Sequence, residues 1–128
     1  AWREYIGSGA WTWFGTFTTS YASSKSSMSG LMDRFGKALR THTTATGLYF
    51  IEPNVRRGEG YHAHAVIEVP EYFKSPSNYQ TVIDLYQKMA GADKGKHMVK
   101  LEAYNQSRKA AEYLTKTMWV NAPEYGVI

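Results

Sequence analysis

The chain has 128 residues, enough for one domain with its own hydrophobic core, and we expect residues 1–128 to form a single domain. It contains no cysteine, which excludes disulfides and thiolate metal sites and is consistent with an intracellular, reducing compartment. The net charge of +4 favours polyanions such as nucleic acid, and no apolar run reaches the length of a membrane span, so no membrane partner is expected.

The hydrophobic pattern predicts elements in the order β-α-β-β-α-β-α. Aromatic and β-branched runs predict strands over residues 11–19, 46–52, 61–69 and 97–104. Apolar residues at helical spacing predict helices over residues 27–40, 75–90 and 106–119, the second beginning at Ser75-Pro76 and ending at Gly91. The tail, residues 121–128, is expected to be partly loose because it contains Pro123 and Gly126.

This order predicts an α+β sandwich, a mainly antiparallel sheet with helices packed on one face. The other face of the sheet is expected to be exposed to solvent and available for function. Four strands are predicted directly, and a fifth would have to come from the N-terminal or C-terminal segment.

The strand over residues 61–69 carries two histidines at alternate positions. Alternate side chains of a strand share a face, so His62 and His64 point the same way, about 7 Å apart at their Cα atoms, and both can reach one metal ion. Glu52 ends the preceding strand, and a turn-rich segment joins the two strands, so a hairpin would bring its carboxylate to the histidines. The ordinary alternative is two polar residues on the wet face of a strand.

The predicted third helix carries a tyrosine between two cations. Lys109 lies four residues before Tyr113 and Lys116 three residues after it, so all three occupy one side of the helix. Nearby positive charge favours the phenolate, which suits attack on a phosphodiester. The alternative is a boundary tyrosine that packs its ring on the sheet and keeps its hydroxyl in water.

Three segments in order resemble the motifs of the HUH endonucleases, the initiators of rolling-circle replication in small circular DNA viruses, phages and plasmids. They are the strand segment 13–19, the trio His62-Ala63-His64 and the sequence Tyr113-Leu114-Thr115-Lys116. The resemblance implies the same β-α-β-β-α-β-α sandwich with a five-stranded sheet. It also implies a site in which Glu52, His62 and His64 hold Mn2+ or Mg2+, and a Tyr113 nucleophile assisted by Lys116.

The resemblance also implies a substrate and partners. The substrate would be single-stranded DNA at a replication origin, within a hairpin or stem-loop, and the product a 5′-phosphotyrosine with a free 3′-hydroxyl. No helicase motif is present in the sequence, so unwinding would come from a host helicase or from a domain outside this chain.

Further DNA contacts are expected from Lys109 of the predicted third helix and from basic residues in loops. Arg56 and Arg57 lie between the second and third strands, and Lys94 and Lys96 precede the fourth; the alternative is a solvated charged loop. Tyr104 is a second, weaker candidate for the nucleophile.

Three other functions stay open. One is a transposase or relaxase of the same superfamily. Another is a non-catalytic RRM-like module that binds single-stranded nucleic acid through exposed aromatic side chains. The third is a metal-dependent phosphodiesterase that uses water in place of tyrosine.

Overall fold

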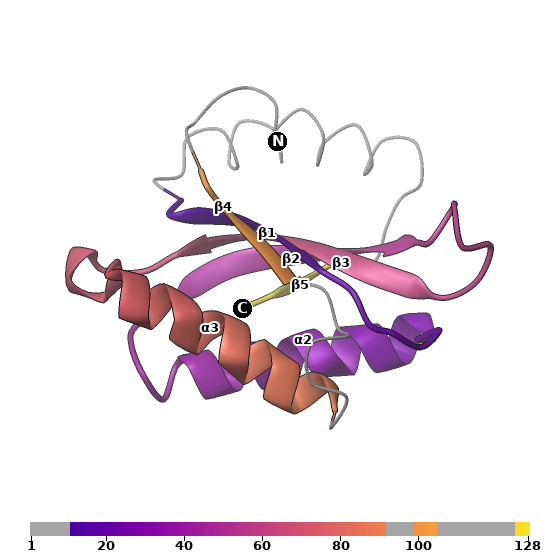
Figure 1. Ribbon diagram of the computed structural model, residues 1–128, viewed down its shortest axis with the longest axis horizontal. Helices are drawn as coiled ribbons and strands as arrows, with labels where there is room; N and C mark the ends of the chain where they lie inside the picture. The colour runs from indigo at the N-terminus through magenta and orange to yellow at the C-terminus, as the bar shows by residue number, and fades with distance from the viewer. Residues whose placement is uncertain (1–10, 92–98, 105–124) are drawn as a thin grey trace.

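The computed structural model describes residues 11–91, 99–104 and 125–128, and in them it shows an α+β fold with a five-stranded antiparallel sheet (Figure 1). The strand order is β4-β1-β3-β2-β5. In chain order the elements are β1 (Trp13–Phe17), α2 (Lys25–Leu39), β2 (Thr46–Pro53), β3 (Tyr61–Glu68), a 3-10 turn (Glu71–Phe73), α3 (Pro76–Ala90), β4 (Val99–Ala103) and β5 (Tyr125–Val127).

Two crossovers are interlocked in this sheet. Strands β1 and β2 are both antiparallel to β3, which lies between them, so α2 connects two parallel strands with a third inserted. In the same way α3 connects β3 to β4, with β1 between them. Both helices lie on one face of the sheet, as predicted (Figure 1).

Both described helices begin at a serine cap. Ser24 accepts a hydrogen bond from the Ser27 amide, and Ser75 accepts one from Asn78, with proline in the first turn of α3. Each helix buries the predicted stripe of apolar side chains against the sheet, including Met28, Leu31, Met32, Phe35 and Leu39 of α2 and Val82 and Tyr86 of α3. The two helix predictions are therefore confirmed, with ends shifted by at most two residues.

The main core lies between these helices and the sheet. The residues of β3 that alternate with the histidines, Ala63, Ala65 and Ile67, are fully buried in it. The small alanines leave room for large aromatic rings, and Phe17 packs with its ring centroid 5.0 Å from that of Tyr86. Because the core uses one face of β3, the histidines are directed to the opposite face.

The opposite face of the sheet differs from the prediction. A second buried cluster covers its centre, formed by Trp11, Leu48, Phe50, Val66 and Tyr104. The expectation of a wholly solvent-exposed face is therefore wrong. The face is buried because the run Leu48-Tyr49-Phe50-Ile51 carries large apolar or aromatic side chains on both sides of β2. Glu52 and His64 lie on the same face and are buried as well.

The C-terminal residues supply the fifth strand. Strand β5 pairs with the outer edge of β2, and the Ile128 amide then donates to the Gly47 carbonyl oxygen at 2.9 Å. The Ile128 side chain is 5% exposed, in the main core. Gly126 lies directly on the Tyr49 ring, where a Cβ atom would not fit. The prediction of a loose tail is wrong for residues 125–128, because the β2 edge satisfies their backbone.

The third helix predicted over residues 106–119 lies outside the described residues. Within the described part of the chain, no helix has the length and apolar character needed to cross a membrane.

One buried tyrosine supports the chain as it leaves β1. The Tyr86 hydroxyl donates to the Thr18 carbonyl oxygen at 2.8 Å, and burial, with a smaller contribution from Tyr21, raises the pKa of Tyr86 well above 10. A raised pKa in the folded state means that the stability it contributes is complete below about pH 10 and is lost as the pH rises further.

We therefore expect Tyr86→Phe to lose about 1 kcal/mol at neutral pH, from the missing hydrogen bond. Between about pH 10 and 12 the variant should lose less stability than the wild type does. Urea unfolding at neutral pH and at about pH 12 measures the free energy of unfolding of the variant and the wild type. The control is replacement of the exposed Tyr72 by phenylalanine. A variant with the same alkaline loss as the wild type would contradict the assignment.

Candidate metal centre

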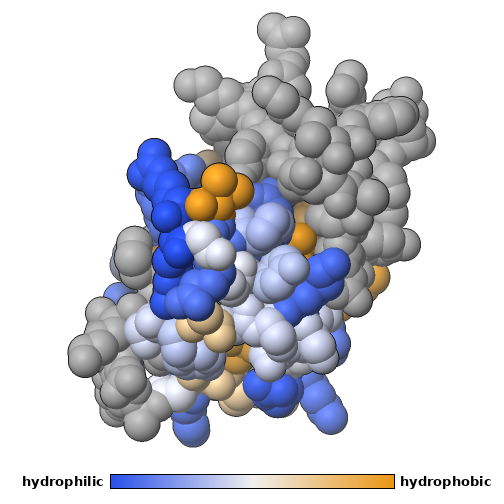
Figure 2. Space-filling view, turned by 90° about the vertical axis from the view of Figure 1, so that its right-hand side faces the viewer, coloured by the Kyte–Doolittle hydropathy of each residue, from blue (hydrophilic) through white to orange (hydrophobic). Residues whose placement is uncertain are grey.

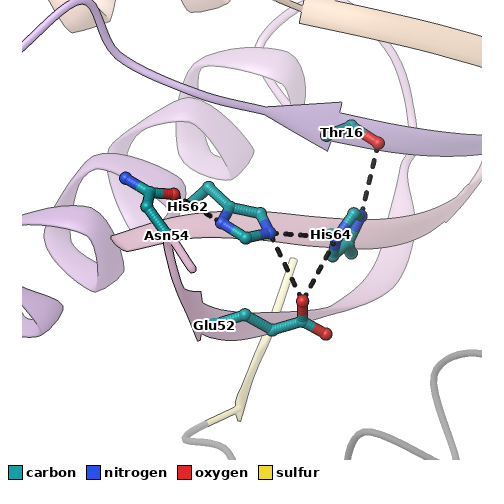
Figure 3. Close-up of polar contacts among 5 residues, drawn as sticks. All are labelled: Thr16, Glu52, Asn54, His62 and His64. Atoms are coloured by element: carbon teal, nitrogen blue, oxygen red, sulfur yellow. Dashed lines mark hydrogen bonds and ion pairs between the residues drawn. The ribbon is translucent and has the colours of Figure 1, made fainter. Parts of the chain in front are cut away.

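Three possible metal ligands meet at one end of the sheet, where β2 and β3 approach their connecting loop. Glu52 is the direct cross-strand partner of His62, and His64 lies two residues further along β3 on the same face. The predicted hairpin therefore brings the carboxylate to the histidines. The Glu52 Oε2 atom is 3.3 Å from the His62 Nε2 atom and 3.4 Å from the His64 Nε2 atom (Figure 3).

Both histidine rings direct the Nε2 atom toward the carboxylate, with 86° between the two ring planes. Their Nε2 atoms are 3.1 Å apart, and both face Glu52. Their Nδ1 atoms point away, His62 to the Asn54 Oδ1 atom at 2.7 Å and His64 to the Thr16 Oγ1 atom at 3.3 Å (Figure 3). Glu52 and His64 are each 7% exposed, whereas His62 is half-buried.

These separations fit a metal ion. Neighbouring ligand atoms of an ion bound at about 2.0–2.2 Å are themselves about 2.8–3.6 Å apart. The three facing atoms here are 3.1, 3.3 and 3.4 Å apart. Imidazole nitrogen and carboxylate oxygen are both ordinary ligands of divalent ions. The group formed by Glu52, His62 and His64 can therefore hold a metal ion through three protein ligands.

An aromatic side chain from β1 covers one side of the centre. The Phe14 ring stacks on the His64 imidazole, with 5.6 Å between the ring centroids and 13° between their planes. Phe14 is two residues before Thr16, so the same strand supplies the ring contact and the hydroxyl that meets the Nδ1 atom of His64. This packing limits rotation of the His64 ring.

A pocket of about 920 Å³ lies beside the centre. Hydroxyl groups line one side of it, and the loop between β2 and β3 lines the other; the lining residues are Thr16, Thr18, Thr19, Ser20, Glu52, Pro53, Asn54, Val55, Arg56, Arg57, His62 and His64. Figure 2 faces the end of the molecule where this loop lies, and its surface there is mainly hydrophilic with a small hydrophobic spot. The pocket therefore offers hydrogen-bonding groups and positive charge next to the possible ion.

The two arginines of the loop lie in different surroundings. Arg57 donates through Nη1 to the Thr19 carbonyl oxygen at 2.9 Å and through Nη2 to the Ser20 carbonyl oxygen at 2.8 Å. It therefore ties the two sides of the pocket together. Gly60, at φ +81°, allows the loop to pass close to the backbone of residue 22, where a Cβ atom would be 2.9 Å from a Cα atom. Arg56 is exposed at the pocket edge.

These surroundings separate the expected effects of the two arginines. Arg57→Ala should lower stability by about 1 kcal/mol, because two hydrogen bonds to backbone oxygens are lost. Arg56→Ala should leave stability unchanged and, if the chain binds single-stranded DNA as the sequence predicts, weaken that binding uniformly across sequences, with a shallower salt dependence. Thermal unfolding and DNA titrations at several salt concentrations measure both. Unchanged DNA binding would remove Arg56 from the candidate contacts.

Tyr104 does not suit the role of a second nucleophile. It belongs to the buried cluster with Phe50 and Val66, and burial raises the pKa of its phenol, which disfavours the phenolate. The other predicted site residues, Tyr113, Lys116, Lys109, Lys94 and Lys96, lie outside the described residues.

Sequence reasoning missed three neighbours of the centre. Asn54 lies two residues after Glu52, so the alternation of the strand could have placed it on the same face. Thr16 and Phe14 carry no comparable signal, because they reach His64 only through the pairing of β1 with β3, 48 residues apart in the case of Thr16.

Comparisons of the chain with family models, with curated proteins and with solved structures gave no match. The functional argument therefore depends on the residues and geometry described above.

Proposed function

We propose that this chain is an HUH endonuclease, which nicks and rejoins single-stranded DNA and so initiates rolling-circle replication. The observation that carries the proposal is the convergence of Glu52, His62 and His64 beside an open pocket. The Tyr113-x-x-Lys116 sequence supplies the nucleophile in this proposal, by its resemblance to the initiator motif.

The topology supports the proposal. The described elements follow the order β-α-β-β-α-β that the resemblance implies, and both helices pack on the face opposite the histidines. This leaves the histidine strand central in the sheet, with β1 and β2 on either side of it. A central strand is a rigid support for metal ligands, because both its edges are paired.

Glu52, His62 and His64 would hold a divalent ion, Mn2+ or Mg2+. Two imidazoles and one carboxylate suit Mn2+ better than Mg2+, which prefers oxygen ligands and retains its waters. When bound, the ion polarises a phosphate oxygen and offsets the negative charge that develops in the transition state.

The covalent step in the proposal belongs to Tyr113. Its oxygen attacks the scissile phosphorus, the bond from phosphorus to the 3′ oxygen breaks, and the departing strand ends in a 3′-hydroxyl. The phenol loses its proton, and the departing oxygen gains one. Lys116 would orient the phosphate or assist loss of the phenol proton, and Lys109 would contribute positive charge. Because the phosphotyrosine retains the energy of the phosphodiester bond, the strand can be rejoined without ATP.

The described aromatic residues argue against an RRM-like binding module. Such modules stack bases on exposed rings. On the histidine face, Trp11, Phe50 and Tyr104 are buried, and the half-buried Phe14 stacks on His64 instead. Among the described residues, this face therefore lacks a row of exposed rings.

The test uses the whole chain, a pool of labelled single-stranded stem-loop oligonucleotides and Mn2+, with chelator as the control. We expect an adduct that survives SDS and that peptide mass spectrometry assigns to Tyr113. Cleavage without an adduct would indicate a phosphodiesterase that uses water, and a shifted band without cleavage would indicate a binding module. Transposases and relaxases share the chemistry, so the preferred DNA from the pool separates them from an initiator.

A further inference from the structure

We propose that Asn54 is a positioning residue, which determines the nitrogen that His62 presents to the metal and so couples the metal centre to the loop between β2 and β3. The inference rests on the metal site of the proposed function, but not on its tyrosine nucleophile.

The orientation of the Asn54 amide follows from its two partners. Its Nδ2 atom is 3.2 Å from the Glu59 carbonyl oxygen, which can only accept a hydrogen bond. The amide nitrogen therefore belongs on that side, and the Oδ1 atom belongs on the side of His62, 2.7 Å from its Nδ1 atom. Since the amide oxygen can only accept, the hydrogen must be on the Nδ1 atom of His62.

This hydrogen determines what the rest of the ring can do. A neutral imidazole with its hydrogen on Nδ1 carries a lone pair on Nε2. In His62 that lone pair is directed at the Glu52 Oε2 atom and the His64 Nε2 atom, at 3.3 and 3.1 Å (Figure 3). The His62 Nε2 atom and the Glu52 Oε2 atom are then both acceptors, so they repel at 3.3 Å, and a cation between them removes the repulsion. The contact with Asn54 therefore prepares His62 for a metal ion.

Thr16 contacts the Nδ1 atom of His64 as Asn54 contacts that of His62. The two contacts differ in length and in whether they fix the tautomer of the ring. Its hydroxyl is 3.3 Å from the Nδ1 atom, a longer contact than the 2.7 Å one at His62. A hydroxyl can also donate or accept, so it does not select one tautomer. Asn54 should consequently matter more to metal affinity than Thr16.

Asn54 is itself held by the loop. The backbone N–H of Asn54 donates to the Gly60 carbonyl oxygen at 2.9 Å, and the backbone carbonyl oxygen of Asn54 accepts from the Gly58 N–H at 3.0 Å. The same loop carries Val55 and Arg56 at the edge of the pocket. Asn54, which orients His62, thus belongs to the loop that a bound DNA strand would contact in the proposed function.

Two substitutions separate positioning from loop structure. Asn54→Asp and Asn54→Leu both lose the Nδ2 hydrogen bond to the loop, but only Asn54→Asp keeps an acceptor for His62. The aspartate cannot reach the ion, because Asn54 meets the ring on the side away from Nε2 (Figure 3). We expect Asn54→Leu to weaken Mn2+ binding by about 10- to 100-fold, and Asn54→Asp to restore most of the affinity. Thr16→Val should have a smaller effect than Asn54→Leu.

The measurements are Mn2+ titration followed by electron paramagnetic resonance, and nitrogen NMR of the metal-free protein at mildly alkaline pH. NMR should show the His62 hydrogen on Nδ1 in the wild type and in Asn54→Asp, and a mixture of tautomers in Asn54→Leu. Equal loss of affinity in both variants, or no loss in either, would overturn the proposal. If Asn54→Leu fails to fold, the wild-type spectrum decides, because a hydrogen on Nε2 of His62 excludes the proposed role. None of these results depends on whether Tyr113 forms an adduct.

Discussion

Tyr113→Phe is expected to abolish the covalent adduct while DNA binding and the fold are retained. Phenylalanine lacks the oxygen that would bond to phosphorus, and no other group can replace it in a phosphotyrosine link. Lys116→Ala should still form the adduct, but about 100-fold more slowly, as expected for loss of a group that assists proton transfer or orients the phosphate. Single-turnover reactions with a labelled oligonucleotide, analysed on denaturing gels, measure both rates.

Tyr104→Phe is the matched control for the tyrosine nucleophile. Because Tyr104 is 9% exposed in an apolar cluster and burial raises the pKa of its phenol, its loss should leave the adduct intact. An adduct that persists in Tyr113→Phe, or that disappears in a folded Tyr104→Phe variant, would exclude the proposed assignment of the nucleophile.

Glu52→Gln is expected to abolish Mn2+ binding without unfolding the metal-free protein. The amide has nearly the shape of the carboxylate and can donate to a histidine nitrogen, but it lacks the charge that attracts the ion. At a Mn2+ concentration of 100 times Kd, the wild type should gain about 2.7 kcal/mol of stability. For a domain of this size the gain corresponds to a rise in Tm of roughly 10 °C, which the variant should not show.

The same substitution should reduce cleavage strongly. An ion at the scissile phosphate contributes several kcal/mol, so its loss lowers the rate on the order of a thousandfold. Glu59→Gln, which removes an exposed carboxylate from the same hairpin loop, is the control and should behave as the wild type does. A Glu52→Gln variant that is still stabilised by Mn2+ would show that the ion binds elsewhere.

The two described helices and most of the strands could be predicted because their signals are local. The apolar stripe from Met28 to Leu39 has the period of a helix, and the serine caps precede it and the next helix. Strand β5 could not be predicted in this way. Residues 125–127 are too few to show a period, and their conformation comes from the edge of β2, which lies far away in the sequence.

The buried histidine face illustrates the same limit. Sequence alternation correctly separated His62 and His64 from the alanines of the core. It did not indicate how much of the remaining face is buried. That depends on how the side chains of three neighbouring strands, such as Leu48 and Val66, come together.

The local geometry of a β-strand was enough to place two imidazoles on one side of the sheet, and a short turn-rich segment was enough to suggest that Glu52 joins them. Of the partners that orient those rings, the same alternation could place Asn54 on their face but could not show its contact with His62, and it could not place Thr16 or Phe14 at all. Asn54 acts through the conformation of its loop, and Thr16 and Phe14 act through a pairing between distant strands. A strand's two faces follow from bond geometry within a few residues, whereas cross-strand neighbours follow from the register, which the whole packed sheet selects.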